Sequence, residues 1–149
     1  MLLDSRLEFA DDLTAWLAQG TLLLGDVIDL GVSRDIGHGQ QMYLVIQVTE
    51  LFASSGSALV NFRLRSDGVA AIHDTTSTAH LETGPMAFAL LTLGAQFVIA
   101  LPPEGLAYEQ FLGVQVVVTV ADTTAGDVNA FLTTEPTVKP TTSYADALN

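Results

Sequence analysis

The sequence predicts an all-β protein, a jelly roll or related β-sandwich of about eight antiparallel strands with extended N- and C-terminal arms. Three observations support this fold class. Short apolar or β-branched segments recur along the chain, and several of them alternate with polar residues. Clusters of Gly, Asp, Ser or Pro separate these segments about every ten residues. The length of 149 residues is enough for one domain with a sizeable core.

Eight segments carry the strand signal. The clearest is 59–65, where Val60, Phe62 and Leu64 alternate with polar side chains, as is typical of a half-buried antiparallel strand. The expected strands are residues 27–30, 41–50, 59–65, 79–82, 87–93, 96–101, 112–120 and 128–132.

The segment before the first expected strand is ambiguous. Leu13, Trp16 and Leu17 would share one face of a two-turn helix, with one of the two preceding aspartates as its N-cap. The alternative is an extended arm. Neither alternative places the segment in the sandwich.

We therefore expect three parts: an N-terminal arm at residues 1–26, the sandwich at 27–132, and a C-terminal arm or tail at 133–149. The last part is rich in Thr and Pro and shows no helical or strand period. It is either a disordered tail or a tether that lies on a neighbouring subunit, with Tyr144 and Leu148 as its anchors.

One uncharged stretch, residues 83–103, approaches the ~20 residues that a membrane-spanning helix requires. Thr92, Gly94 and Gln96 interrupt its apolar run, and acidic residues flank it. We therefore expect two buried strands joined at Gly94 and no membrane partner. No targeting segment is expected at the start, where acidic residues stand in place of a basic region.

Composition excludes several classes of function. The chain has no cysteine, so disulfides, thiol nucleophiles and cysteine-based zinc sites are absent. With 17 acidic and 5 basic residues the net charge is −12, which would repel a nucleic-acid backbone. Charged residues make up only 15% of the chain, against about 25% in typical soluble domains. Such a plain surface is typical of one that partners cover.

The sequence offers no catalytic constellation. His38, His73 and His80 are far apart, and we expect them to be solvent-exposed in loops rather than to bind a metal. The segment DTTAGD between Asp122 and Asp127 is a candidate calcium loop, but a hairpin turn is the favoured interpretation. We expect no enzymatic activity, no catalytic residue, no metal and no cofactor.

Several short motifs indicate a family resemblance, which the spacing of individual residues does not. They are MLLDxxLxF at 1–9, VIDLG at 27–31, RDIGxG at 34–39, LPPxG at 101–105 and TAGxVxAFL at 124–132. In this order, over residues 1–132, the chain resembles a family of tailed-phage capsid cement (decoration) proteins. The C-terminal residues 135–149 match no pattern of that family.

The resemblance implies a jelly-roll subunit on the outer surface of a capsid built from an HK97-like major capsid protein. Such a subunit cements neighbouring capsomers and stabilises the head against internal DNA pressure. It also implies a homo-oligomer, a dimer more readily than a trimer, and no catalytic residues. The alternative is a jelly-roll binding module for carbohydrate or calcium on a phage or cell surface.

Six residues are the candidate partner-binding residues: Leu2, Leu3, Leu7, Phe9, Arg34 and Asp35. The four apolar ones open the chain, and we expect them to form a capsid-binding arm that is only loosely tied to the core of the subunit. Arg34 and Asp35 are adjacent and opposite in charge. This pair either orients its loop or contacts the capsid, or is an exposed pair that contributes little.

Overall fold

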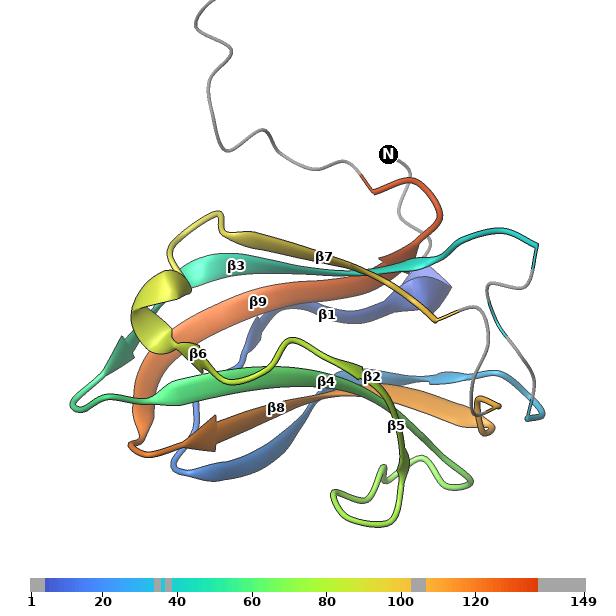
Figure 1. Ribbon diagram of the computed structural model, residues 1–149, viewed down its shortest axis with the longest axis horizontal. Coiled ribbons are helices and arrows are strands. Elements are labelled where there is room, and N and C mark those ends of the chain that lie inside the picture. The colour runs from blue at the N-terminus through green and yellow to red at the C-terminus, as the bar shows by residue number, and fades with distance from the viewer. Residues whose placement is uncertain (1–4, 34–35, 37–38, 103–106, 137–149) are drawn as a thin grey trace, which may run out of the picture.

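The computed structural model describes residues 5–33, 36, 39–102 and 107–136, and within them nine strands form two antiparallel sheets packed face to face (Figure 1). Two short 3₁₀ segments, η1 (Ser5–Leu7) and η2 (Phe88–Leu90), accompany them. The strands are β1 (Glu8–Thr14), β2 (Gly20–Asp29), β3 (Tyr43–Ser54), β4 (Leu59–Asp67), β5 (Thr78–Glu82), β6 (Met86–Ala87), β7 (Gln96–Ala100), β8 (Phe111–Thr119) and β9 (Thr123–Thr133).

The strand order is that of a jelly roll, which confirms the expected fold class. One sheet runs β1-β9-β3-β7 and the other β2-β8-β4-β5, with β6 as an additional short partner of β4. The antiparallel pairs are nested along the chain: β4 with β5, β3 with β7, β2 with β8, and β1 with β9. This nesting arises when one long hairpin folds over into two sheets. The two strands of each pair therefore lie in the same sheet.

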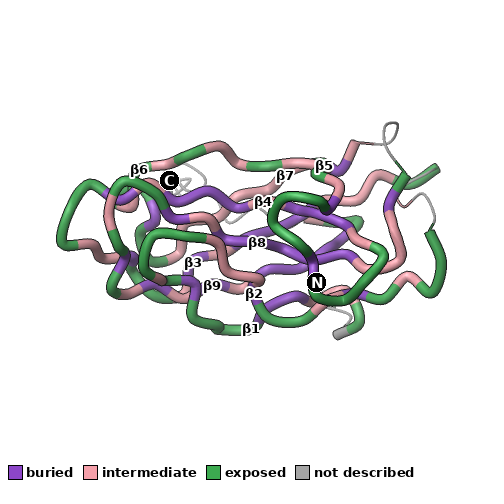
Figure 2. Tube along the Cα trace, turned by 90° about the horizontal axis from the view of Figure 1, so that it is seen from below, coloured by how far each residue is buried: buried purple, intermediate pink, exposed green. Residues whose placement is uncertain are grey.

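The core lies between the sheets and is filled by alternate residues of the strands. Leu24, Val114 and Leu64 sit opposite one another across β2, β8 and β4, and all three are buried. Across the layer, the rings of Phe52 and Phe62 pack edge to face with their centroids 6.5 Å apart. Figure 2 shows the buried residues running along the strands, while the connecting loops are largely exposed.

The N-terminal segment is not the arm or helix that the sequence suggested. Residues 8–26 belong to the sandwich, because β1 pairs with β9 and most of β2 pairs with β8. The alternation of β1 is hidden in the sequence since its pairing with β9 is irregular at two places and its exposed face carries three acids. The sandwich thus begins near residue 8 and not at residue 27.

This placement corrects the role of Phe9. Its side chain is 1% exposed and belongs to the core, and Leu7 is half-buried and packs against the same core. Phe9 therefore stabilises its own subunit and does not reach a partner. Leu2 and Leu3 lie outside the described residues.

The expected strand at 87–93 is also corrected. Only Met86 and Ala87 pair with β4, because β5 already pairs with the rest of that strand from Arg63 to Ser66. The chain then turns through η2 before β7. Among the described residues, no helix is long and apolar enough to cross a membrane.

Replacing Phe9 with alanine should lower the free energy of unfolding by about 3–5 kcal/mol, because the substitution leaves a cavity in the core. Leu13→Ala is the matched control: it lies on the same strand, but its side chain is 40% exposed, so its effect should be much smaller. Urea unfolding followed by circular dichroism measures both. Small and equal effects would contradict the position of Phe9 in the core.

Candidate functional site

Most of the partner-binding residues predicted from the sequence cannot define a site. Leu2, Leu3, Arg34 and Asp35 lie outside the described residues, and Phe9 is in the core. Only Leu7 remains partly accessible, beside β1. The candidate surface must therefore come from the exposed residues that the fold brings together.

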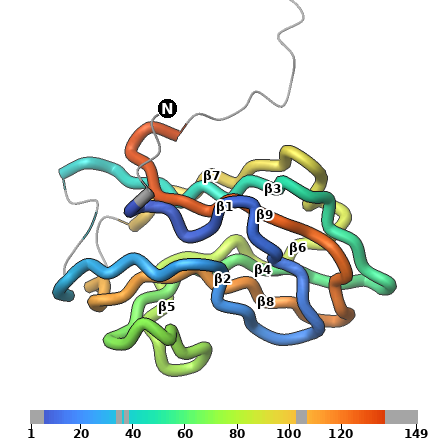
Figure 3. The backbone as a smooth tube through the Cα atoms, turned by 180° about the vertical axis from the view of Figure 1, so that it is seen from behind, coloured from blue at the N-terminus to red at the C-terminus, as the bar shows by residue number. Residues whose placement is uncertain are grey.

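Four connections meet at one end of the sandwich: 15–19, 55–58, 83–95 and 120–122. Nested antiparallel pairing brings them there, and both views of the chain place them side by side, on the left in Figure 1 and on the right in Figure 3. In these four segments Asp122 is the only charged residue.

Large apolar side chains stand exposed at this end. Leu93 is 70% exposed, Leu90 64% and Val120 63%. We call this surface the apolar end; its residues are Trp16, Leu90, Leu93 and Val120, which all lie in these connections. Single exposed apolar residues are ordinary, but several at one end of a domain that has a single charged residue in its connections form a candidate binding surface.

Hydrogen bonds hold two of these connections in a fixed arrangement. The backbone N–H of Leu17 donates to Oγ1 of Thr123 at 3.0 Å, and the N–H of Thr123 donates to the carbonyl of Leu17 at 3.1 Å. Asp122 accepts from the N–H of Gln19 at 2.9 Å, so the single charge of this end has a structural partner. The hydroxyl of Ser54 donates to the Asp122 carbonyl at 2.7 Å, which links the third connection to them.

The fourth connection, 83–95, is fixed by its backbone. The N–H of Phe88 donates to the carbonyl of Ala58 at 3.1 Å, and the N–H of Phe52 donates to the carbonyl of Leu91 at 3.2 Å. Val120 has a φ of 73°, a conformation that is rare and costly for a β-branched residue. The apolar end is thus presented by preorganised loops, which lowers the entropy lost on binding.

The two arginines on the outer face of the β2-β8-β4-β5 sheet are engaged in contacts within the subunit. Arg63 lies 3.3 Å from Glu82 and 3.7 Å from Asp74, and Nη2 of Arg65 donates to the carbonyl of Ser77 at 2.7 Å. These contacts fasten the connection between β4 and β5 to the outer face of the β2-β8-β4-β5 sheet. The two arginines are used to hold the fold together and leave acids and apolar groups for partners.

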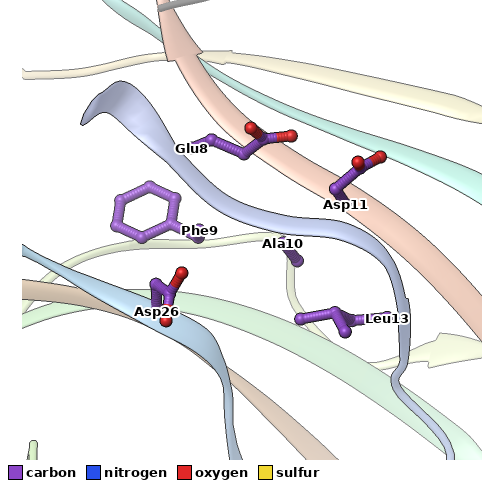
Figure 4. A pocket seen from close by; sticks show the side chains of 6 residues that line it. All are labelled: Glu8, Phe9, Ala10, Asp11, Leu13 and Asp26. Atoms are coloured by element: carbon purple, nitrogen blue, oxygen red, sulfur yellow. The ribbon is translucent and has the colours of Figure 1, made fainter. Parts of the chain in front are cut away.

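A shallow groove runs between β1 and β2, the edge strands of the two sheets (Figure 4). The side chains of Glu8 and Asp11 point to one side of β1, while Phe9 and Leu13 point to the other (Figure 4). Glu8 and Asp11 thus lie on the side of β1 away from Asp26 (Figure 4). In the part of the chain that the structure describes, no three His, Asp or Glu side chains are placed to hold a metal ion.

The candidate calcium loop has another role. Asp122 is bound to the backbone of Gln19, and Asp127 lies within β9, opposite Glu50 of β3. The two carboxylates thus serve a connection and a strand. The segment is not the hairpin turn that the sequence favoured, because residues 123–127 belong to β9 and the preceding strand β8 lies in the other sheet.

The most organised polar cluster surrounds His80. Nε2 of His80 lies 2.7 Å from Oγ of Ser66, and the imidazole stacks on the ring of Tyr108 with centroids 4.0 Å apart. Oγ of Ser66 also accepts from the N–H of Glu109 at 3.0 Å, so the hydroxyl links the imidazole to the backbone. Ser66 is fully buried, so no substrate reaches its hydroxyl and the cluster is structural.

Burial lowers the pKa of His80 below its usual 6.5, against the opposing effect of the nearby Glu109 carboxylate. The folded protein then binds this proton less readily than the unfolded chain, so stability should fall as the pH drops below 6.5. We expect His80→Phe, which keeps a ring against Tyr108, to lose less stability between pH 7.5 and 5.5. Urea unfolding at both pH values measures this, and an equal loss in both proteins would contradict it.

Comparison with known proteins gives one match that covers most of the chain. The model of the family described as Bbp16 matches residues 17–132, which include the strands β2 to β8 in full and nearly all of β9. No curated protein matches the chain.

Proposed function

The chain belongs to the Bbp16 family, a family of phage-related proteins, and we propose that it is a structural virion protein that binds the outer surface of a phage capsid. In this role it cements neighbouring capsomers of an HK97-like major capsid protein and stabilises the head against internal DNA pressure. It acts by binding alone and needs neither a catalytic residue nor a cofactor.

The observation that carries the proposal is the apolar end. Full burial of a large apolar side chain contributes about 1.5–3 kcal/mol, and three of those at the apolar end, Leu90, Leu93 and Val120, are more than 60% exposed in the free subunit. A surface of this kind, held by hydrogen-bonded loops, is suited to a permanent protein contact. A capsid offers many identical copies of such a contact.

Charge supports an outer position. The net charge of −12 opposes contact with packaged DNA, and Arg63 and Arg65 are occupied within the subunit. In the described part of the chain, acids line the grooves beside β1 and β2, where Arg6 stands among Glu8, Asp26 and Asp29, and this excess of acids disfavours a phosphate backbone. The proposal therefore places the protein on the capsid exterior, away from the genome.

Reconstitution tests the function directly. Heads of the phage that carries this gene, assembled without the protein, should bind the purified chain saturably at fixed positions in cryo-electron microscopy maps. Decorated heads should release DNA at a higher temperature than bare heads. Failure of the chain to bind bare heads at micromolar concentration would overturn the proposal.

Substitutions at the apolar end locate the contact. Leu90→Glu combined with Leu93→Glu should weaken head binding at least tenfold, because burying the new carboxylates against the capsid would require their desolvation. The melting temperature should change little, because both side chains are exposed in the free subunit. Val69→Glu is the matched control, since Val69 is 47% exposed and lies in the β4–β5 connection. Equal head binding by the double variant and the control would contradict a contact at the apolar end.

A further inference from the structure

The connection between β8 and β9 contains a rare backbone conformation. Val120 has a φ of 73°, and the N–H of Ala121 donates to the carbonyl of Thr119 at 2.9 Å. A hydrogen bond between residues two positions apart, closed around a residue with this φ, forms a γ-turn with a positive φ at its centre. Turns of this form are rare and strained. For a β-branched residue such as valine, a positive φ is an outlier.

The fold explains why a sharp turn stands here. β8 lies in one sheet and β9 in the other, so the chain changes sheets within residues 120–122. Neighbouring connections hold the turn: the hydroxyl of Ser54 donates to the carbonyl of Asp122 at 2.7 Å, and a Cβ at Gly56 would lie 2.8 Å from Cβ of Ala121. A strained conformation persists where the surrounding structure fixes it in this way.

The fold does not explain why the central residue is a valine. Glycine adopts a positive φ without steric cost, and Asn or Asp adopts it more readily than a β-branched residue. In the described part of the chain, the other non-glycine residue with a positive φ is Asp12, which belongs to this tolerant group. The side chain of Val120 is 63% exposed, so packing within the subunit offsets little of the strain.

We propose that Val120 is the anchor residue of the apolar end and that its side chain inserts into a small apolar pocket on the outer surface of a capsid subunit. This inference rests on the proposed function and names the residue that determines its contact. Strained, exposed residues of this kind cluster at binding sites. Because the turn is rigid and valine has few side-chain conformers, the anchor is presented in one orientation and little entropy is lost on binding.

The charge beside Val120 defines the partner further. Asp122 is exposed and is the only charged residue of the four connections at this end. Its Oδ1 accepts from the N–H of Gln19 at 2.9 Å, which fixes the carboxylate near the turn. A surface that covers Val120 also approaches this carboxylate, so a complementary partner carries a Lys or Arg beside its apolar pocket. The net charge of −12 also speeds association with a cationic surface.

The free subunit tests the strain without a capsid. Val120→Gly and Val120→Asn should each raise the melting temperature by about 2–4 °C, because both residues adopt a positive φ more readily than valine. Val69→Gly is the matched control, since Val69 is 47% exposed, lies in the β4–β5 connection and has no positive φ. Its melting temperature should stay unchanged or fall. A fall as large in both Val120 variants would overturn the proposal, because valine would then stabilise its own subunit.

Bare heads test the anchor. Val120→Gly should weaken head binding about tenfold or more although it melts at a higher temperature, a combination that a merely structural residue would not produce. Val120→Thr keeps the shape and the β-branch, so its melting temperature should stay close to that of the unmodified protein. Its head binding should still weaken, because the hydroxyl would be buried in an apolar pocket. Val69→Gly should bind heads as the unmodified protein does.

Salt tests the cationic group beside the pocket. Head binding by the unmodified protein should weaken as sodium chloride is added. Asp122→Asn keeps an oxygen that can accept from Gln19, so it should fold normally and show a smaller dependence on salt. An equal salt dependence of both proteins would contradict this part of the partner's chemistry.

The outcomes separate this inference from the proposed function. If the unmodified protein binds heads and both Val120→Gly and Val120→Thr bind them equally well, Val120 is not the anchor and the proposed function stands. Equal weakening by Val69→Gly would also overturn the anchor, because the effect would not be specific to the turn. If the unmodified protein does not bind bare heads at micromolar concentration, the proposed function fails and the anchor fails with it.

Discussion

The structure depends on the insertion of β9 between β1 and β3. Its residues pair with β1 on one side and with β3 on the other, and Val128, Ala130 and Leu132 face the core. The last strand in the described part of the chain is thus a central strand of its sheet, and β8 takes the same position between β2 and β4. Neither sheet is complete until these late strands are in place.

A close approach at the start of β9 makes this insertion possible. A Cβ at Gly126 would lie 2.5 Å from the ring of Phe52, and the backbone there has a φ of 137°, which other residues rarely adopt. The glycine lets β9 pass directly over the ring on β3. Four residues before Gly126, Asp122 accepts hydrogen bonds from Gln19 and Ser54 and so links three connections of the apolar end. The same short segment therefore fixes both the packing on Phe52 and the arrangement of these connections.

Charged side chains are unevenly distributed over the surface of the sandwich. The arginines of β4 fasten the β4–β5 connection, and the acids of β1, β2 and β5 stand on or near sheet edges. The edge strand β7 carries no charge, and the connections at the end of the sandwich beside it carry only that of Asp122. Both lie in or next to the uncharged stretch 83–102, which as a linear sequence resembled a buried or membrane segment.

The sequence by itself determined the fold class, most of the strands and the absence of a recognisable catalytic motif, because alternation, turn residues and composition are local properties. It did not reveal that residues 8–26 complete the sandwich, since β1 is an irregular edge strand whose acids mask the buried Phe9. Nor could it indicate that Trp16, Leu90 and Val120 share one surface. That grouping is decided by nested pairing, which brings connections about 30 to 100 residues apart to the same end.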